Sequence, residues 1–248
     1  FDGDKADFLT NYEVGWKTSW LNDKLRLNGA IYHALWDNFQ FSFLGDNGLT
    51  NLTNAGGAKL QGVEMDLQWA ATSSFSLYGG FALQKAELTK DFCLSLGTDG
   101  KPLPRADCIA NNPAEFTASG TRLPSTPRFK GSLTGRYEFP MAGTDGHVQA
   151  SLVHEGSKRT ALLESENSVL GDGEAYTQVD LAFGVEKDKW SAELFIKNAF
   201  DEQAKLYNYT ECTVDICGGI IYSIPSLALF LLQGLGIARK LDVDDQRH

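Results

Sequence analysis

Apolar and polar residues alternate along most of this chain, the pattern of β-strands that have one apolar face. In residues 128–139 the odd positions, from Phe129 to Phe139, are apolar or glycine, while the even positions, from Arg128 to Glu138, are polar or charged. The same period recurs at 12–20, 179–186 and 190–197. The pattern predicts an all-β, antiparallel fold.

About nine strands are expected, at 10–20, 24–43, 58–70, 75–88, 125–139, 146–157, 175–186, 190–200 and one after 219. Their connections alternate in length: four short ones at 21–24, 71–74, 140–146 and 187–189, and four long ones at about 45–57, 89–124, 158–174 and 201–218. Antiparallel strands then place all short turns at one end and all long loops at the other. That asymmetry is typical of transmembrane β-barrels in outer membranes.

The aromatic residues favour the same interpretation. Five of them lie beside a short turn, where they would form an interfacial girdle: Trp20, Trp69, Phe75, Phe139 and Trp190. The lipid-facing set is expected to include Phe129, Leu133, Tyr137, Leu181, Phe183, Leu194 and Ile196. A soluble β-sandwich or β-barrel binding module also alternates and remains an alternative.

Composition removes other classes of protein. No stretch of about 18 apolar residues occurs, which argues against a transmembrane helix, and the mean hydropathy is −0.24. The net charge is −10 without a visible basic patch, so no nucleic-acid partner is expected.

Seven short segments, in this order and spacing, resemble the C-terminal barrel of TonB-dependent receptors. They are Asn11–Lys17, Leu25–Ala30, Trp36–Gln40, Asn54–Gly56, Gly62–Leu67, Leu123–Phe129 and Lys197–Asp201. The resemblance covers roughly residues 8 to 208.

The resemblance implies about nine C-terminal strands of a 22-stranded barrel in the outer membrane. It also implies partners: outer-membrane lipid, an N-terminal plug domain, a TonB box that engages the inner-membrane TonB complex, and a small-molecule ligand, by default a ferric siderophore. The plug, the TonB box and a signal peptide are expected upstream of Phe1. A passive porin-like channel is the other membrane alternative.

The polar positions of the strands are expected to face the barrel lumen, as a hydrated wall or as a contact surface for the plug. These are Glu13, Lys17, Glu64, Asp66, Arg128, Lys130, Arg136, Asp180, Glu193 and Lys197. Ligand selection would fall to the long loops, where candidate residues are Asn47, Asn51, Asn54, Tyr207 and Tyr209.

No catalytic, metal or cofactor site is expected. The four histidines, His33, His147, His154 and His248, lack metal-ligand spacing, and neither a nucleophile elbow nor a phosphate-binding glycine loop occurs. His147 is expected in a turn, and His154 facing lipid or the interface.

The four cysteines fall in two long loops on the oxidising side of the membrane. Pairing within each loop predicts a disulfide between Cys93 and Cys108 and a second between Cys212 and Cys217.

Residues 1–226 are expected to form the barrel segment. Alternation is lost in the apolar run at 227–232, so residues 227–248 are expected to be a divergent tail. The sequence as a whole predicts a non-enzymatic receptor and TonB-energised transporter of a scarce ligand.

Overall fold

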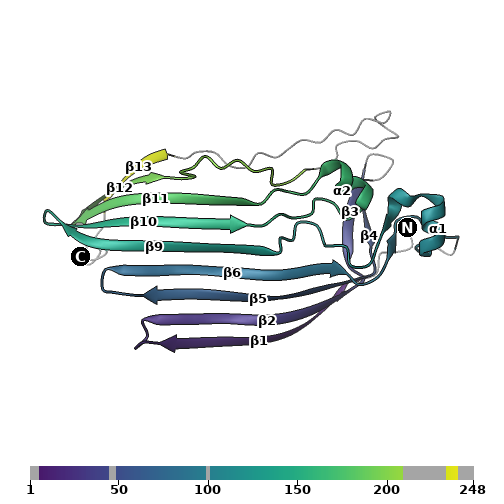
Figure 1. Ribbon diagram of the computed structural model, residues 1–248, viewed down its shortest axis with the longest axis horizontal. Helices are drawn as coiled ribbons and strands as arrows, with labels where there is room; N and C mark the ends of the chain where they lie inside the picture. The colour runs from purple at the N-terminus through teal and green to yellow at the C-terminus, as the bar shows by residue number, and fades with distance from the viewer. Residues whose placement is uncertain (1–5, 45–48, 99–100, 209–232, 240–248) are drawn as a thin grey trace, which may run out of the picture.

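A computed structural model describes residues 6–44, 49–98, 101–208 and 233–239. Its main feature is a nine-stranded sheet in which each strand pairs antiparallel with its neighbours, in the order β1-β2-β5-β6-β9-β10-β11-β12-β13 (Figure 1). The strands are β1 (Phe8–Trp20), β2 (Leu25–Asp37), β5 (Gly57–Ala70), β6 (Phe75–Leu88), β9 (Phe129–Met141), β10 (Thr144–Glu155), β11 (Tyr176–Lys187), β12 (Trp190–Ile196) and β13 (Gln233–Arg239). The all-β antiparallel prediction is confirmed, and the sheet is open, with β1 and β13 at its edges.

One end of the sheet carries only short turns (Figure 1). Between β9 and β10 the turn consists of Ala142 and Gly143, with φ of 50° and 79°, the left-handed geometry of a two-residue hairpin. Between β5 and β6, the Thr72 hydroxyl accepts hydrogen bonds from the backbone N–H groups of Ser74 and Phe75. Residues within the turns themselves, through left-handed backbone angles or side-chain hydrogen bonds, therefore form these two connections.

The register joins the alternating positions into two continuous faces. One row crosses the sheet through Leu27, Leu67, Gly79, Leu133, Leu152 and Val179, and the neighbouring row passes through Asn28, Asp66, Gly80, Ser132, Val153 and Gln178. The face that holds the Leu133 row is called the apolar face, and the face that holds the Ser132 row is called the polar face.

All seven residues expected to face lipid lie on the apolar face, between 36% and 53% exposed in the isolated chain. The prediction that they are not packed against a second sheet is confirmed for the described residues. A continuous apolar surface of this extent on a β-sheet marks contact with another apolar phase.

The opposite end carries a folded assembly of loops (Figure 1), here called the cap. It contains β3 (Gln40–Leu44) paired with β4 (Thr50–Asn54), β7 (Phe92–Cys93) paired with β8 (Phe116–Thr117), the helices α1 (Arg105–Asn111) and α2 (Glu164–Leu170), and the 3-10 helix η1 (Pro113–Glu115). Neither helix of the described chain is long and apolar enough to cross a membrane.

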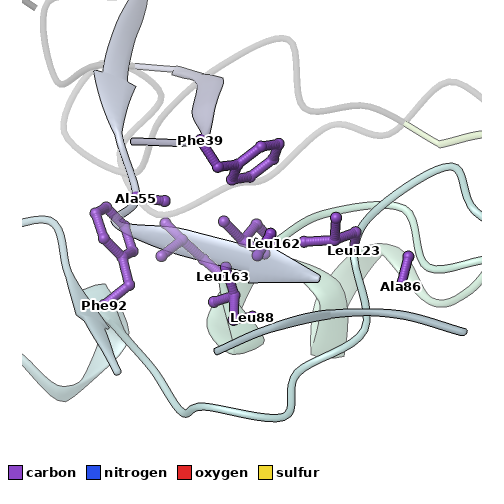
Figure 2. Close-up of a cluster of buried hydrophobic side chains, with 9 residues drawn as sticks. Phe39, Ala55, Ala86, Leu88, Phe92, Leu123, Leu162 and Leu163 are labelled. Carbon is purple, nitrogen blue, oxygen red and sulfur yellow. The ribbon is translucent and has the colours of Figure 1, made fainter. Parts of the chain in front are cut away.

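The cap has a hydrophobic core, shown in Figure 2. Phe39, Phe92, Leu123, Leu162 and Leu163 come from three loops, those between β2 and β5, β6 and β9, and β10 and β11, and pack with residues from the ends of β5 and β6. Those strand residues, Ala58, Ala86 and Leu88, occupy polar-face positions, because Ala58 pairs with Leu88 in the same alternation as Glu64 with Ala82. The cap therefore folds over the polar face of the sheet.

The structure corrects several sequence-based boundaries. The strand expected at 24–43 ends at Asp37, because Asn38 adopts a left-handed φ of 53° and directs the chain into β3, which belongs to a separate sheet. The strand expected to begin at 125 begins at Phe129, since residues 123–126 belong to the cap.

The loops expected at 45–57 and 89–124 contain regular elements, β4 in the first and β7, α1, η1 and β8 in the second. The turn expected at 140–146 is present but shorter, since β9 continues to Met141 and β10 begins at Thr144. The expectation that His147 lies in a turn is therefore wrong, because it lies in β10. The strand expected after 219 is found at Gln233–Arg239, within the segment expected to be a divergent tail.

Candidate functional site

The polar face is the first candidate surface, because its charged side chains project together from several strands. Of the residues expected to face the lumen, eight lie in strands and on this face: Glu13, Lys17, Glu64, Asp66, Lys130, Arg136, Asp180 and Glu193. Arg128 directly precedes β9, and Lys197 directly follows β12.

Small residues make two hollows beside the carboxylates of β5. One, of about 430 Å³, lies over Gly80 and Ala82 and is bordered by Glu64, Asp66 and Lys130. The other, of about 460 Å³, lies over Gly15 and Ala30 and is bordered by the same two acids with Glu13 and Lys17. The polar face thus offers recessed sites with charges of both signs.

Near the short turns, His147 and Glu193 form a second polar contact. The His147 Nε2 lies 3.1 Å from a Glu193 carboxylate oxygen, although β11 separates their strands. The imidazole can cross that strand because residue 184 is glycine, and a Cβ there would lie 2.2 Å from the ring. On the neighbouring strand, Arg136 Nε donates to Glu138 at 2.9 Å.

His154 lies on the apolar face, paired with Gly131 and Thr177. Its Nδ1 is 2.8 Å from the Thr177 hydroxyl, and its ring centroid is 5.7 Å from that of Phe129. A hydroxyl and an aromatic ring therefore accommodate this histidine. Among the described residues no group of three or more metal-ligating side chains gathers at one place.

The cap contains a larger hollow, of about 580 Å³, within the range of small-molecule sites. Its wall includes Trp36, Phe39, Phe41, Tyr207 and Glu166. Burial raises the pKa of the Glu166 carboxyl above its ordinary value. Tyr207 was a sequence candidate for ligand contact, whereas the other four residues were not, because no periodic signal connects these distant loops.

Asn54, another loop candidate, does not line this hollow. Asn54 Nδ2 donates to the Asn38 carbonyl oxygen at 2.7 Å and so supports the turn before β3. Asn51 lies in β4. Asn47 and Tyr209 lie outside the described residues.

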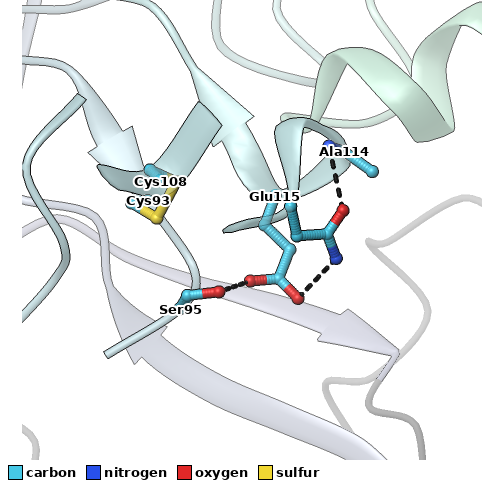
Figure 3. The surroundings of a disulfide bond; sticks show 6 residues. Cys93, Ser95, Cys108, Ala114 and Glu115 are labelled. Carbon is cyan, nitrogen blue, oxygen red and sulfur yellow. Dashed lines mark hydrogen bonds between the residues drawn. A yellow bond between two sulfur atoms is a disulfide. The ribbon is translucent and has the colours of Figure 1, made fainter. Parts of the chain in front are cut away.

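A disulfide joins Cys93 in β7 to Cys108 in α1, with the Cα atoms 6.1 Å apart (Figure 3). Both cysteines are buried. Close by, Glu115 accepts hydrogen bonds from the Ser95 hydroxyl and from the Asn112 side-chain amide. The bond therefore fastens a strand of the cap to its first helix. Cys212 and Cys217 lie outside the described residues.

Comparison with known proteins supplies the family. Residues 2–199 match the family model described as "TonB dependent receptor-like, beta-barrel". The metal-pseudopaline receptor CntO of Pseudomonas aeruginosa is 28% identical over 170 residues, which are 68% of this chain and 20% of that receptor. The chain therefore spans about a fifth of the length of the curated relative that it matches.

Two solved structures share the fold. The ferric yersiniabactin uptake receptor FyuA of Yersinia pestis gives a TM-score of 0.59 at 18% identity, over 82% of this chain and 26% of that one. The siderophore receptor PiuA of Acinetobacter baumannii also gives 0.59 at 18% identity, over 92% and 27% of the two chains.

The family match covers most of the chain and agrees with the apolar face, the polar face and the arrangement of turns and loops. The outer membrane is the site of this family's barrels, and the family is not enzymatic. The chain belongs to the TonB-dependent receptor family and forms part of its outer-membrane β-barrel.

Proposed function

We propose that this chain is the C-terminal part of the barrel of a receptor that imports a metal chelate, most simply a ferric siderophore, with energy from the TonB complex. The observation that carries the proposal is the aromatic hollow in the cap, which lies toward the polar face at the loop end, combined with the family match. Two of the similar proteins have names that specify ferric yersiniabactin or a siderophore.

The polar face supports a second part of the proposal, a plug domain inside the barrel. Its recesses beside Glu64 and Asp66 would admit side chains from such a domain. The ten residues expected to face the lumen would then form the wall that surrounds the plug. A TonB box would belong to the same part of the receptor, outside this chain.

Chelates of metals other than iron are the second candidate ligand, because the relative CntO is a metal-pseudopaline receptor. The two candidates share one chemistry, a metal wrapped by an organic chelator. They differ in which metal is carried and in which chelator contacts the loops.

Uptake in cells tests the proposed function. The full-length gene is expressed in a strain without its own siderophore receptors, and accumulation of radioactive iron or zinc is measured with a panel of chelators. We expect accumulation of at least one chelate, and its loss when TonB is deleted. Accumulation that persists without TonB would support a passive channel instead, and no accumulation of any chelate would contradict the proposal.

A further inference from the structure

The hollow in the cap has a composition that restricts the charge of its ligand. It is built from five segments that are distant in sequence: the stretch from the end of β2 into β3, Leu60 of β5, residues 123–126, residues 160–170 with α2, and residues 207–208. Because Phe39, Leu123 and Leu162 of this wall also belong to the core in Figure 2, packing within the protein holds their three segments in place without a ligand. A preformed site selects ligands by complementarity with its fixed wall.

Aromatic rings make up much of that wall. Trp36 and Phe39 meet edge to face with ring centroids 4.8 Å apart, and Phe39 stacks on Phe41 at 6.4 Å. The Trp36 Nε1 donates to an Asp7 carboxylate oxygen at 2.8 Å, which fixes the indole. Such a wall favours flat or apolar ligand groups, and the negative ring faces attract cations rather than anions.

The charged lining of the hollow, as far as it is described, is negative. Among its described lining residues none is lysine or arginine, and the one carboxylate is that of Glu166. Three cations directly precede lining residues in the sequence, Lys59, Arg122 and Arg159. Each is already paired, with Glu87 at 2.8 Å, Asp172 at 2.6 Å and Glu164 at 2.7 Å respectively.

Glu166 adds to this preference. The described hydrogen bonds and ion pairs give its carboxylate no cationic partner, and burial raises its pKa. A partly desolvated carboxylate is stabilised by an approaching positive charge and is destabilised by a negative one, more strongly than the same group in water.

We propose that the hollow receives an aromatic or apolar part of a metal chelate whose overall charge is neutral or positive, and that it discriminates against polyanionic chelates. This inference rests on the proposed function and specifies its ligand. A chelate that carries several negative charges would have to lose water beside Glu166 and the ring faces without gaining an ion pair.

The experiment measures binding to the purified full-length receptor by quenching of tryptophan fluorescence. The probes are three ferric chelates of similar size: a neutral cyclic tris-hydroxamate, a singly cationic linear tris-hydroxamate and a trianionic tris-catecholate. We expect the neutral and cationic probes to bind at least about tenfold more tightly than the trianionic one.

Two variants and one control assign the preference to this hollow. Glu166→Gln should narrow the ratio of cationic to trianionic affinity by about threefold or more. Ser42→Lys, at an exposed position of the wall, should raise trianionic affinity by about tenfold. Asp107→Asn removes an exposed charge from the other helix of the cap and lies outside the wall, so it should leave the ratio unchanged.

The outcomes separate this inference from the proposed function. The inference is overturned, while the receptor function stands, by any of three results. They are equal binding of the three probes, tightest binding of the tris-catecholate, and a ratio of cationic to trianionic affinity that neither variant changes. Failure of every chelate to bind, together with no TonB-dependent accumulation in cells, would remove the proposed function as well.

Discussion

The sheet and the cap obey different physical rules within one chain. In the sheet, large hydrophobic side chains such as Leu133 and Phe183 remain 44% and 40% exposed. In the cap, Leu123 and Leu162 are 4% and 3% exposed and belong to a packed core. The sheet depends on the membrane to cover its apolar face, whereas the cap buries its own apolar residues as a soluble domain does.

The difference shows where specificity can be built. Backbone pairing in the sheet satisfies the N–H and C=O groups that lipid cannot satisfy, which confines this part of the chain to regular paired strands. The cap lies outside that constraint and can combine helices, short strands and a disulfide. The residues of the cap come from distant loops, so a change in one loop reshapes the hollow without changing the strands of the sheet.

A charge on the apolar face should produce the largest effect. Leu133→Arg places a guanidinium midway along β9, and we expect a loss of about 2–4 kcal/mol of folding free energy in lipid. The measurement is the urea dependence of folding of the full-length receptor into vesicles, followed by the gel shift of the heat-modifiable barrel. The matched control is Leu133→Met, which keeps the position apolar and should fold as the parent does. A Leu133→Arg receptor as stable as the Met variant would contradict the assignment of this face to lipid.

The cap should depend next on its disulfide. Removing the bond with Cys93→Ala and Cys108→Ala opens a loop with a sequence separation of 15. The entropy of that loop predicts a loss of about 3 kcal/mol in the stability of the cap. Protease cleavage of the cap at increasing urea measures the loss, while the gel shift of the barrel should remain. Ile109→Ala, at an exposed position of α1, is the control; equal resistance of the double variant and this control would show that the cap does not need the bond.

The sequence predicted the sheet better than the cap for a physical reason. In a strand with lipid on one side and water on the other, the pattern of apolar and polar residues repeats every second residue. Each position from Phe129 to Tyr137 therefore indicates which face it occupies. A cap core collects single residues such as Phe39, Leu123 and Leu163 from different loops, and no local period connects them. The break at Asn38 was missed because apolar residues continue past it, and only its backbone conformation reveals the turn.

Replacement of Asn198, which lies just after β12 where the sheet gives way to a loop, should have a smaller effect. Asn198 is fully buried: its side-chain amide donates to the Glu202 carbonyl oxygen at 3.0 Å and accepts from the Glu202 N–H at 2.9 Å. Asn198→Ala leaves those backbone groups unpaired and should cost about 2 kcal/mol. The urea dependence of folding into vesicles measures this loss of stability, with Asn28→Ala on the polar face as the control. A loss no larger than that of the control would contradict the role of this side chain in ending the strand.

The smallest effect should be a pH dependence of the cap that comes from Glu166. Burial raises the pKa of this carboxyl above its ordinary value of 4.5, so the folded cap holds the proton more tightly than the unfolded chain does. The stability of the cap should therefore fall as pH rises from the ordinary pKa through the raised one, and should be constant below and above that window. Protease resistance of the cap between about pH 4 and about pH 8 measures the change. In Glu166→Gln this component should be absent, whereas Glu164→Gln, which removes an exposed carboxyl of the same helix, should retain it. An identical pH profile for the parent and Glu166→Gln would show that water reaches this carboxylate freely, and would weaken the charge preference inferred for the hollow.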